Sequence, residues 1–142
     1  MNKINVAEKL ALFADYCNPR IIGELNDSHV KVVKLKGDFI WHHHDSEDEL
    51  FFVVKGTLRM WVRETQNQNK KHGSEESEQA SEREIVLRPG EFIIIPRGTE
   101  HLPKADPNDN KGECHMILLE PKTTLNTGNI TNERTIAELE RL

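Results

Sequence analysis

Three consecutive histidines and a group of acidic residues stand directly before an apolar run in the stretch WHHHDSEDELFFVVKG, residues 41–56. Imidazole and carboxylate groups are common ligands of divalent metals, so this stretch is a candidate metal site. Side chains alternate along an extended chain, so His42 and His44 point to one side while His43 points to the other. Two imidazoles on one side can hold a single ion. If the acidic residues form a turn, Glu49 returns beside them at the start of the next strand.

A fourth ligand has to come from another part of the chain, and His101 is the best candidate. It follows an apolar run and the turn at residues 96–98, which redirects the chain just before it. Asp48 competes with Glu49, but alternation turns Asp48 to the opposite side. His115, in a late apolar run, either reaches the pocket or packs on the outer face, and packing is the favoured reading.

The elements that must position these residues are mainly short strands. From residue 20 to residue 121, runs rich in Val, Ile, Leu and Phe alternate with turn residues, which indicates an all-β sandwich or barrel in a single domain. Short amphipathic helices are expected over residues 5–18 and 131–142. The polar segment 66–82 is expected to be a solvated insertion at a hairpin tip, so His72 within it is not expected to bind metal.

Composition limits the classes of function. The 142 residues carry a net charge of −5 without a basic cluster, which argues against nucleic acid and anionic membrane as partners. The apolar runs are too short to span a bilayer, and the N-terminal residues do not resemble a secretory signal. Cys17 and Cys114 lie far apart and form no CxxC pair. They are therefore expected to be free thiols in a reducing compartment, and we expect a cytoplasmic location.

The order and spacing of these residues resemble the two sequence motifs of the cupin superfamily. The residues of the first motif are Gly37, His42, His44, Glu49 and Gly56. Those of the second motif are Gly90, Pro96, Gly98 and His101. The gap from Gly37 to His42 is one residue shorter than usual, and Ala105 stands where many cupins have Asn. Neither departure touches the ligand set.

The resemblance implies an all-β double-stranded β-helix, or jelly-roll barrel, of the small single-domain cupin type. It also implies one divalent transition metal, which could be Fe, Mn, Zn or Ni. The residues carried over as its ligands are His42, His44, Glu49 and His101. Three neutral imidazoles and one carboxylate leave a dication with a net charge of about +1, which favours an anionic or oxygen-chelating small molecule as the partner.

The resemblance leaves several functions open. An Fe(II)-type dioxygenase acting on a small oxygenated molecule is the leading hypothesis, and no catalytic residue is identified for it. The alternatives are a non-catalytic metal-dependent binding protein, a structural metal protein and a sugar or sugar-phosphate isomerase. An isomerase needs a proton-transfer group, for which His115 and Glu113 are the candidates at hand. The chain has no phosphate-binding glycine loop, which weakens that alternative.

The apolar run at residues 50–54 predicts a covered outer sheet face. Phe51 and Val53 share the side of Glu49 and are expected to line the cavity wall. The alternate residues face outward and are also apolar, so this outer face has to be covered by the N-terminal helix or by a second subunit. A homodimer is therefore expected.

Overall fold

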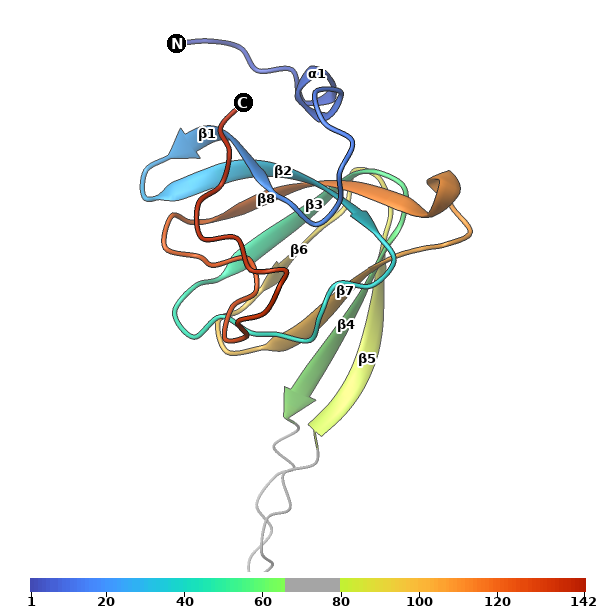
Figure 1. Ribbon diagram of the computed structural model, residues 1–142. Coiled ribbons are helices and arrows are strands. Elements are labelled where there is room, and N and C mark those ends of the chain that lie inside the picture. The colour runs from blue at the N-terminus through green and yellow to red at the C-terminus, as the bar shows by residue number, and fades with distance from the viewer. Residues whose placement is uncertain (66–79) are drawn as a thin grey trace, which may run out of the picture.

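The computed structural model describes residues 1–65 and 80–142, and its strands form two facing antiparallel sheets (Figure 1). The larger sheet has the strand order β1-β2-β8-β3-β6. Its strands are β1 (Arg20–Leu25), β2 (Ser28–Lys36), β3 (Glu49–Lys55), β6 (Phe92–Ile95) and β8 (Glu113–Pro121). The smaller sheet, in the order β5-β4-β7, consists of β4 (Leu58–Thr65), β5 (Ala80–Leu87) and β7 (Glu100–Ala105). This arrangement confirms the expected all-β jelly-roll barrel.

Alternation along the strands turns one apolar face of each sheet into the space between them. The larger sheet contributes Val33, Leu35, Phe51, Val53 and Met116, and the smaller sheet contributes Leu58, Met60, Val62 and Leu87. A tight turn after β3 fixes how the sheets meet. Gly56 has a φ of +81° there, and a Cβ on it would lie 2.1 Å from the backbone oxygen of Glu113, so only glycine fits.

β4 and β5 form the hairpin that the sequence indicated. They pair along their whole length, from Leu58 opposite Leu87 to Thr65 opposite Ala80. The predicted insertion at 66–82 extends too far, because residues 80–82 belong to β5. Residues 66–79, which include His72, lie outside the described part of the chain.

The N-terminal helix α1 (Val6–Leu10) lies outside the barrel, above β2 in Figure 1. Asn5 caps it, since the side-chain oxygen of Asn5 accepts a hydrogen bond of 3.1 Å from the backbone of Glu8. The helix covers part of the outer face of the larger sheet. The buried residues of this contact are Leu10, Ile22 and Val32.

The predicted helix over residues 5–18 is wrong beyond Leu10, because Lys34 takes the backbone groups that a longer helix needs. An α-helix through this region would bond the Cys17 N–H to the Phe13 carbonyl. Instead, Lys34 Nζ donates to the Phe13 carbonyl at 2.6 Å, and the Cys17 N–H donates to the Lys34 carbonyl at 2.8 Å. Tertiary contacts with β2 thus outweigh the helical pattern.

No helix forms over residues 131–142, so the predicted C-terminal helix is wrong as well. Asn132 accepts a hydrogen bond of 2.8 Å from the backbone N–H of Arg134, a local turn bond that competes with helix formation. Further along, the backbone N–H of Leu142 donates to the carbonyl of Ile21 at 3.0 Å. The chain therefore ends beside β1 as an irregular segment, drawn in red in Figure 1.

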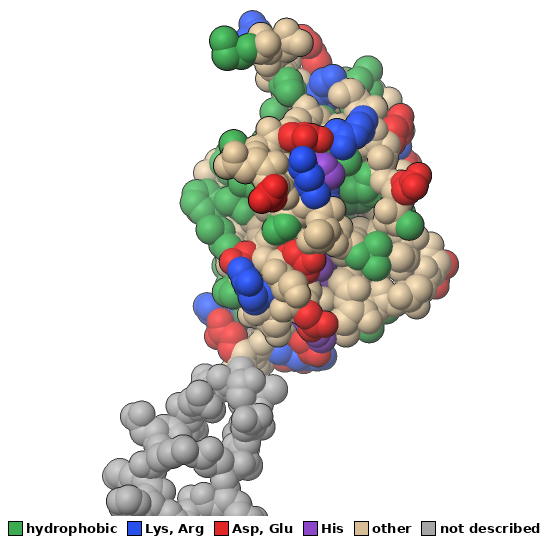
Figure 2. Space-filling view, turned by 90° about the vertical axis from the view of Figure 1, so that its left-hand side faces the viewer, with side chains coloured by type: hydrophobic (Ala, Val, Ile, Leu, Met, Phe, Trp, Pro, Cys, Tyr) green, Lys and Arg blue, Asp and Glu red, His purple; other side chains and the backbone are tan. Residues whose placement is uncertain are grey.

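Charges of both signs are interspersed on one face of the molecule. On the face shown in Figure 2, Lys and Arg side chains lie next to Asp and Glu side chains, with smaller groups of hydrophobic atoms between them. Within the described residues, no helix is long and apolar enough to cross a membrane.

Candidate metal centre

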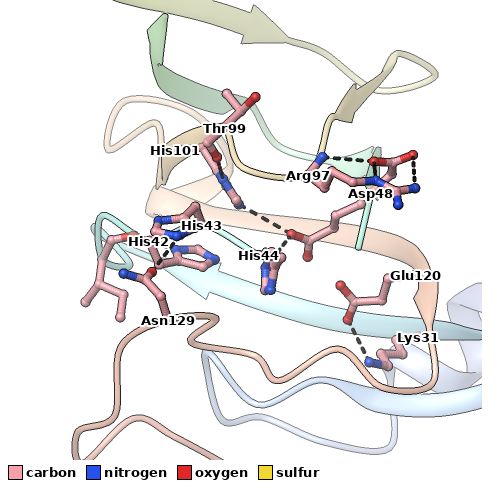
Figure 3. Close-up of polar contacts among 12 residues, drawn as sticks. Lys31, His42, His43, His44, Asp48, Arg97, Thr99, His101, Glu120 and Asn129 are labelled. Atoms are coloured by element: carbon pink, nitrogen blue, oxygen red, sulfur yellow. Dashed lines mark hydrogen bonds and ion pairs between the residues drawn. The ribbon is translucent and has the colours of Figure 1, made fainter. Parts of the chain in front are cut away.

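Four side chains capable of binding a metal converge inside the barrel. One nitrogen or oxygen atom of each lies within 4.8 Å of those of the other three, and all four residues are buried. They are His42, His44, Glu49 and His101, the set implied by the sequence motifs. They come from three places: the segment after β2, the start of β3, and β7. Figure 3 labels the three histidines. We call the four residues the metal cluster.

The segment that carries His42 and His44 is not a regular strand, although its sequence suggested one. On one side it is held by β7 and the turn before it. His42 donates to the backbone oxygen of His101 at 3.1 Å and accepts from the backbone N–H of His101 at 2.9 Å. The N–H of Gly98 donates to the carbonyl of His44 at 2.7 Å. This pairing brings the rings of His42 and His101 to a centroid distance of 4.3 Å.

On its other side, the histidine segment is held by residues 122–142, which we call the C-terminal segment. The backbone N–H of His43 donates to Asn129 Oδ1 at 2.9 Å, and the Asn129 N–H donates to the His43 carbonyl at 3.0 Å (Figure 3). Gly128 permits this approach, because a Cβ there would lie 2.1 Å from the His43 carbonyl oxygen. The sequence motifs gave no sign of this support.

Backbone carbonyls orient two of the imidazoles. His42 Nδ1 donates to the carbonyl of Ile40 at 2.9 Å, and His101 Nδ1 donates to that of Thr99 at 2.9 Å. Since Nδ1 carries the hydrogen in each ring, the neutral imidazole keeps a lone pair on Nε2. Such a bond on the outer nitrogen is the usual arrangement of a metal-binding histidine.

Three atoms of the metal cluster have no hydrogen-bond partner among the described residues: His44 Nε2, Glu49 Oε2 and His101 Nε2. The two nitrogens lie 3.2 and 3.4 Å from the Glu49 oxygen, but neither contact has hydrogen-bond geometry. Buried polar atoms without partners are uncommon and cost free energy. A divalent cation would satisfy all three atoms, so this donor set fits a metal.

The protonation states also suit a metal. Burial lowers the pKa of His42 to about 4, and the neighbouring His101 adds to that shift. Burial by itself would raise the pKa of Glu49, but its contacts with His101 and His44 outweigh burial and hold that pKa well below the usual range. At neutral pH His42 is therefore neutral and Glu49 ionised, which are the forms that bind metals.

A second buried ionic group, Glu120 with Lys31, lies beside the metal cluster. Lys31 Nζ donates to Glu120 Oε1 at 2.6 Å, and both side chains are buried. Burial, followed by the adjacent charge of Glu49, raises the pKa of Glu120, and Lys31 opposes the rise. Neither residue belongs to the sequence motifs, yet strand alternation predicts that both are buried. Glu120 shares the buried face of β8 with Cys114, Met116 and Leu118.

A cavity of about 470 Å³, including its opening to solvent, adjoins the metal cluster. His42, Glu49 and Glu120 line part of it. The apolar walls include Val33, Leu35, Phe39, Phe51, Met116 and Leu118. Phe51 thus lines the cavity as expected, whereas Val53 packs in the core. Concave sites with apolar walls and a few polar groups typically bind small molecules.

As expected, His43 and Asp48 lie outside the metal cluster. His43 turns away from it and donates through Nε2 to Asp45 at 2.9 Å. Asp48 accepts a hydrogen bond of 2.9 Å from the backbone N–H of Arg97 and also pairs with its guanidinium (Figure 3). Both contacts stabilise the turns next to the metal cluster.

His115 and Glu113 lie away from the cavity. They occupy the less buried face of β8, where His115 Nε2 donates to Glu113 Oε2 at 2.9 Å and the Tyr16 hydroxyl donates to the other oxygen of Glu113. Neither residue lines the cavity. The favoured expectation of outer-face packing is confirmed for His115.

Comparison with known families identifies the chain. The family model Cupin_2, described as a cupin domain, matches residues 29–120, which is more than half of the sequence. The chain therefore belongs to the cupin family, as the two motifs predicted.

The chain is also similar to individual proteins. A cupin-2 domain containing protein from Shewanella frigidimarina NCIMB 400 is 35% identical, with a TM-score of 0.64 over 84% of this chain and 94% of that one. The uncharacterized protein YdbB of Bacillus subtilis (strain 168) is 30% identical over 80 residues, 56% of each chain, so the match spans about half of that relative. Hydroquinone 1,2-dioxygenase from Sphingomonas sp. TTNP3, solved with 4-hydroxybenzoate bound, has a TM-score of 0.62 at 18% identity over 84% of this chain and 74% of its own. That likeness shows the fold alone.

Proposed function

We propose that this cupin binds one divalent transition metal and acts with it on a small oxygenated molecule, as an Fe(II)-type dioxygenase. The residues that would hold the ion are His42, His44, Glu49 and His101. The observation that carries the proposal is the set of three buried, unpartnered atoms in the metal cluster. Removing such atoms from water is costly unless a cation compensates for it, and mixed imidazole–carboxylate sets suit iron and manganese.

An octahedral divalent ion held by four protein ligands keeps two positions for oxygen ligands, whereas a tetrahedral zinc shell would be full. Other residues of the chain would orient the ligands and form the binding cavity. The carbonyls of Ile40 and Thr99 hold two imidazoles in the binding tautomer. The apolar walls of the cavity would contact the carbon skeleton of a bound molecule.

The position of the proton-transfer candidates weighs against an isomerase. His115 and Glu113, the two groups that the sequence offered for that role, do not line the cavity. A general base must lie within hydrogen-bond reach of the proton that it moves. Glu120 does line the cavity and is the remaining candidate base for an isomerase among the described residues, so the oxygen dependence of turnover has to separate the two functions.

Metal analysis followed by an oxygen assay tests the proposal. Protein purified without a metal-affinity column should contain about one divalent ion per chain. The Fe(II)-loaded form should consume O₂ with a small diol or acid, and the Zn(II)-loaded form should not. Failure to bind metal under every loading condition would contradict the metal centre. Turnover by the Zn(II) form without O₂ would favour an isomerase, and metal binding without turnover in any form would favour a binding protein.

A homodimer is also part of the proposal. α1 covers the outer sheet face near Val54 and Ile117, but Phe92 and Ile94 of β6 remain 60% and 53% exposed. A second subunit would remove these side chains from water. Light scattering at micromolar concentration should therefore show two chains, and a monomer would contradict the dimer.

A further inference from the structure

Glu120 has one oxygen that is bound and one that is free. Oε1 accepts the 2.6 Å bond from Lys31, whereas Oε2 is buried without a hydrogen-bond partner among the described residues. In Figure 3 the free oxygen lies on the side of His44, while the bound oxygen points to Lys31. Glu120 also lines the cavity. A buried, unpartnered acceptor therefore lies at the cavity wall next to the metal cluster.

The other polar groups of the cavity wall are already engaged or weak. Asn126 donates to the carbonyl of Arg134 at 2.7 Å and accepts from the backbone N–H of Ile136 at 2.9 Å. Cys17 offers a thiol, which is a poor hydrogen-bonding group. Outside the metal cluster and within the described residues, Glu120 Oε2 is thus the strong acceptor of the cavity that still lacks a donor.

The charges around Glu120 define which groups it accepts. The Lys31 ammonium compensates one carboxylate, and a divalent ion held by Glu49 would offset the charge facing Glu120 from that side. Paired with Lys31 and no longer facing an uncompensated Glu49, Glu120 would be ionised and could only accept hydrogen bonds. A ligand carboxylate beside it would meet like charge in a poorly solvated site. A hydroxyl group would instead supply the missing hydrogen bond.

We propose that Glu120 is a ligand-recognition residue, whose free oxygen accepts a hydrogen bond from a hydroxyl of a small molecule that binds the metal through another oxygen. The inference rests on the proposed metal centre and narrows its ligand to a compact, largely apolar molecule with at least two oxygens, such as a vicinal diol. Lys31 is a positioning residue, because it holds the other oxygen of Glu120. The apolar walls suit the carbon skeleton of such a molecule.

Calorimetric titration of anaerobic, Mn(II)-loaded protein with catechol and with 2-fluorophenol tests this recognition. The two probes are similar in size, but only catechol carries a second hydroxyl. The informative variant is Lys31→Met/Glu120→Met, which removes both charges and leaves neither one buried alone. It should lower the preference for catechol about tenfold or more, the range expected for a hydrogen bond to a charged group. Glu120→Gln, which removes only the charge, should give a smaller loss.

Controls separate the possible failures. Glu113→Gln changes a carboxylate on the opposite face of β8 and should leave the preference unchanged. Metal content is measured for every variant. If the double variant keeps its metal and its full preference, or if metal-loaded wild type does not bind catechol, the recognition role is wrong although the metal centre stands. If the double variant loses its metal, Glu120 supports the metal and not the ligand, which also overturns the inference. A wild type that never binds metal refutes the proposed function itself.

Discussion

The barrel interior contains two groups of ionisable side chains that differ in how their charges are balanced. Lys31 and Glu120 form a pair in which the protein supplies both signs, 2.6 Å apart. The metal cluster combines three imidazoles with the Glu49 carboxylate and leaves three of its atoms without partners in the described structure. The charges of Lys31 and Glu120 compensate each other within the fold. The metal cluster needs a bound cation to compensate its carboxylate and to contact its unpartnered atoms.

This difference predicts that the ion pair contributes to stability, whereas the metal cluster contributes to binding. A balanced pair is sensitive to the loss of either partner, because the remaining charge stays buried alone. The metal cluster is expected to behave in the opposite way. Substitution of its residues should remove buried unpartnered atoms, which cost free energy, and should also abolish metal binding.

Removing two members of the metal cluster should abolish metal binding while the fold remains. The His44→Ala/His101→Ala variant should fall from about one ion per chain to almost none, since two of four ligands are lost. Its far-ultraviolet circular dichroism should stay β-type because the barrel has its own core. His43→Ala is the matched control and should keep its metal. Retention of the ion by the double variant would place the site elsewhere.

Breaking the ion pair should instead reduce stability. Lys31→Met leaves the Glu120 carboxylate buried without its counter-charge and should lower the free energy of unfolding by about 3–5 kcal/mol. Denaturant titration of metal-free protein measures this loss. Adding Glu120→Met should restore most of the stability. A single variant as stable as wild type would show that the pair is not balanced in the way described.

A weaker effect is expected from the C-terminal support of the metal cluster. Asn129→Ala removes the acceptor for the His43 N–H and should lower metal affinity about tenfold, as changes next to metal ligands commonly do. Competition with a chelator measures the affinity. Asn129→Asp keeps a side-chain acceptor and should lose less. Equal affinity in all three proteins would mean that β7 alone fixes the histidine segment.

The smallest effect is expected at the hairpin tip. Replacing residues 66–79 by Asn-Gly joins Thr65 to Ala80, which already face each other at the ends of β4 and β5. Both metal content and association state should be unchanged, as measured by metal analysis and light scattering. Loss of either would assign a role to the replaced segment.

The metal cluster could be predicted from the sequence because its signal is local and ordered. His42 and His44 share one side of an extended segment, Glu49 opens the next strand, and His101 follows a glycine turn. The structure adds that this segment is irregular and is held by hydrogen bonds to His101 and Asn129. Those bonds join residues far apart in sequence, and no short-range pattern contains them.

The two terminal helices show what local patterns miss. Their apolar spacing favoured helix, but Lys34 captures the backbone near Phe13, and Ile21 pairs with the backbone at Leu142. Both outcomes depend on tertiary partners. Lys31 and Glu120 were a different omission, since strand alternation alone places each of them on a buried face.

The close packing of Gly128 against the His43 carbonyl couples docking of the C-terminal segment to metal binding. If docking of the C-terminal segment favours the histidine geometry that binds an ion, then by thermodynamic linkage the ion must favour docking by the same factor. Metal would then slow hydrogen exchange and proteolytic cleavage in residues 122–142, which contain none of the four candidate ligands. Truncation of the C-terminal segment would therefore weaken the affinity of the metal cluster for its ion.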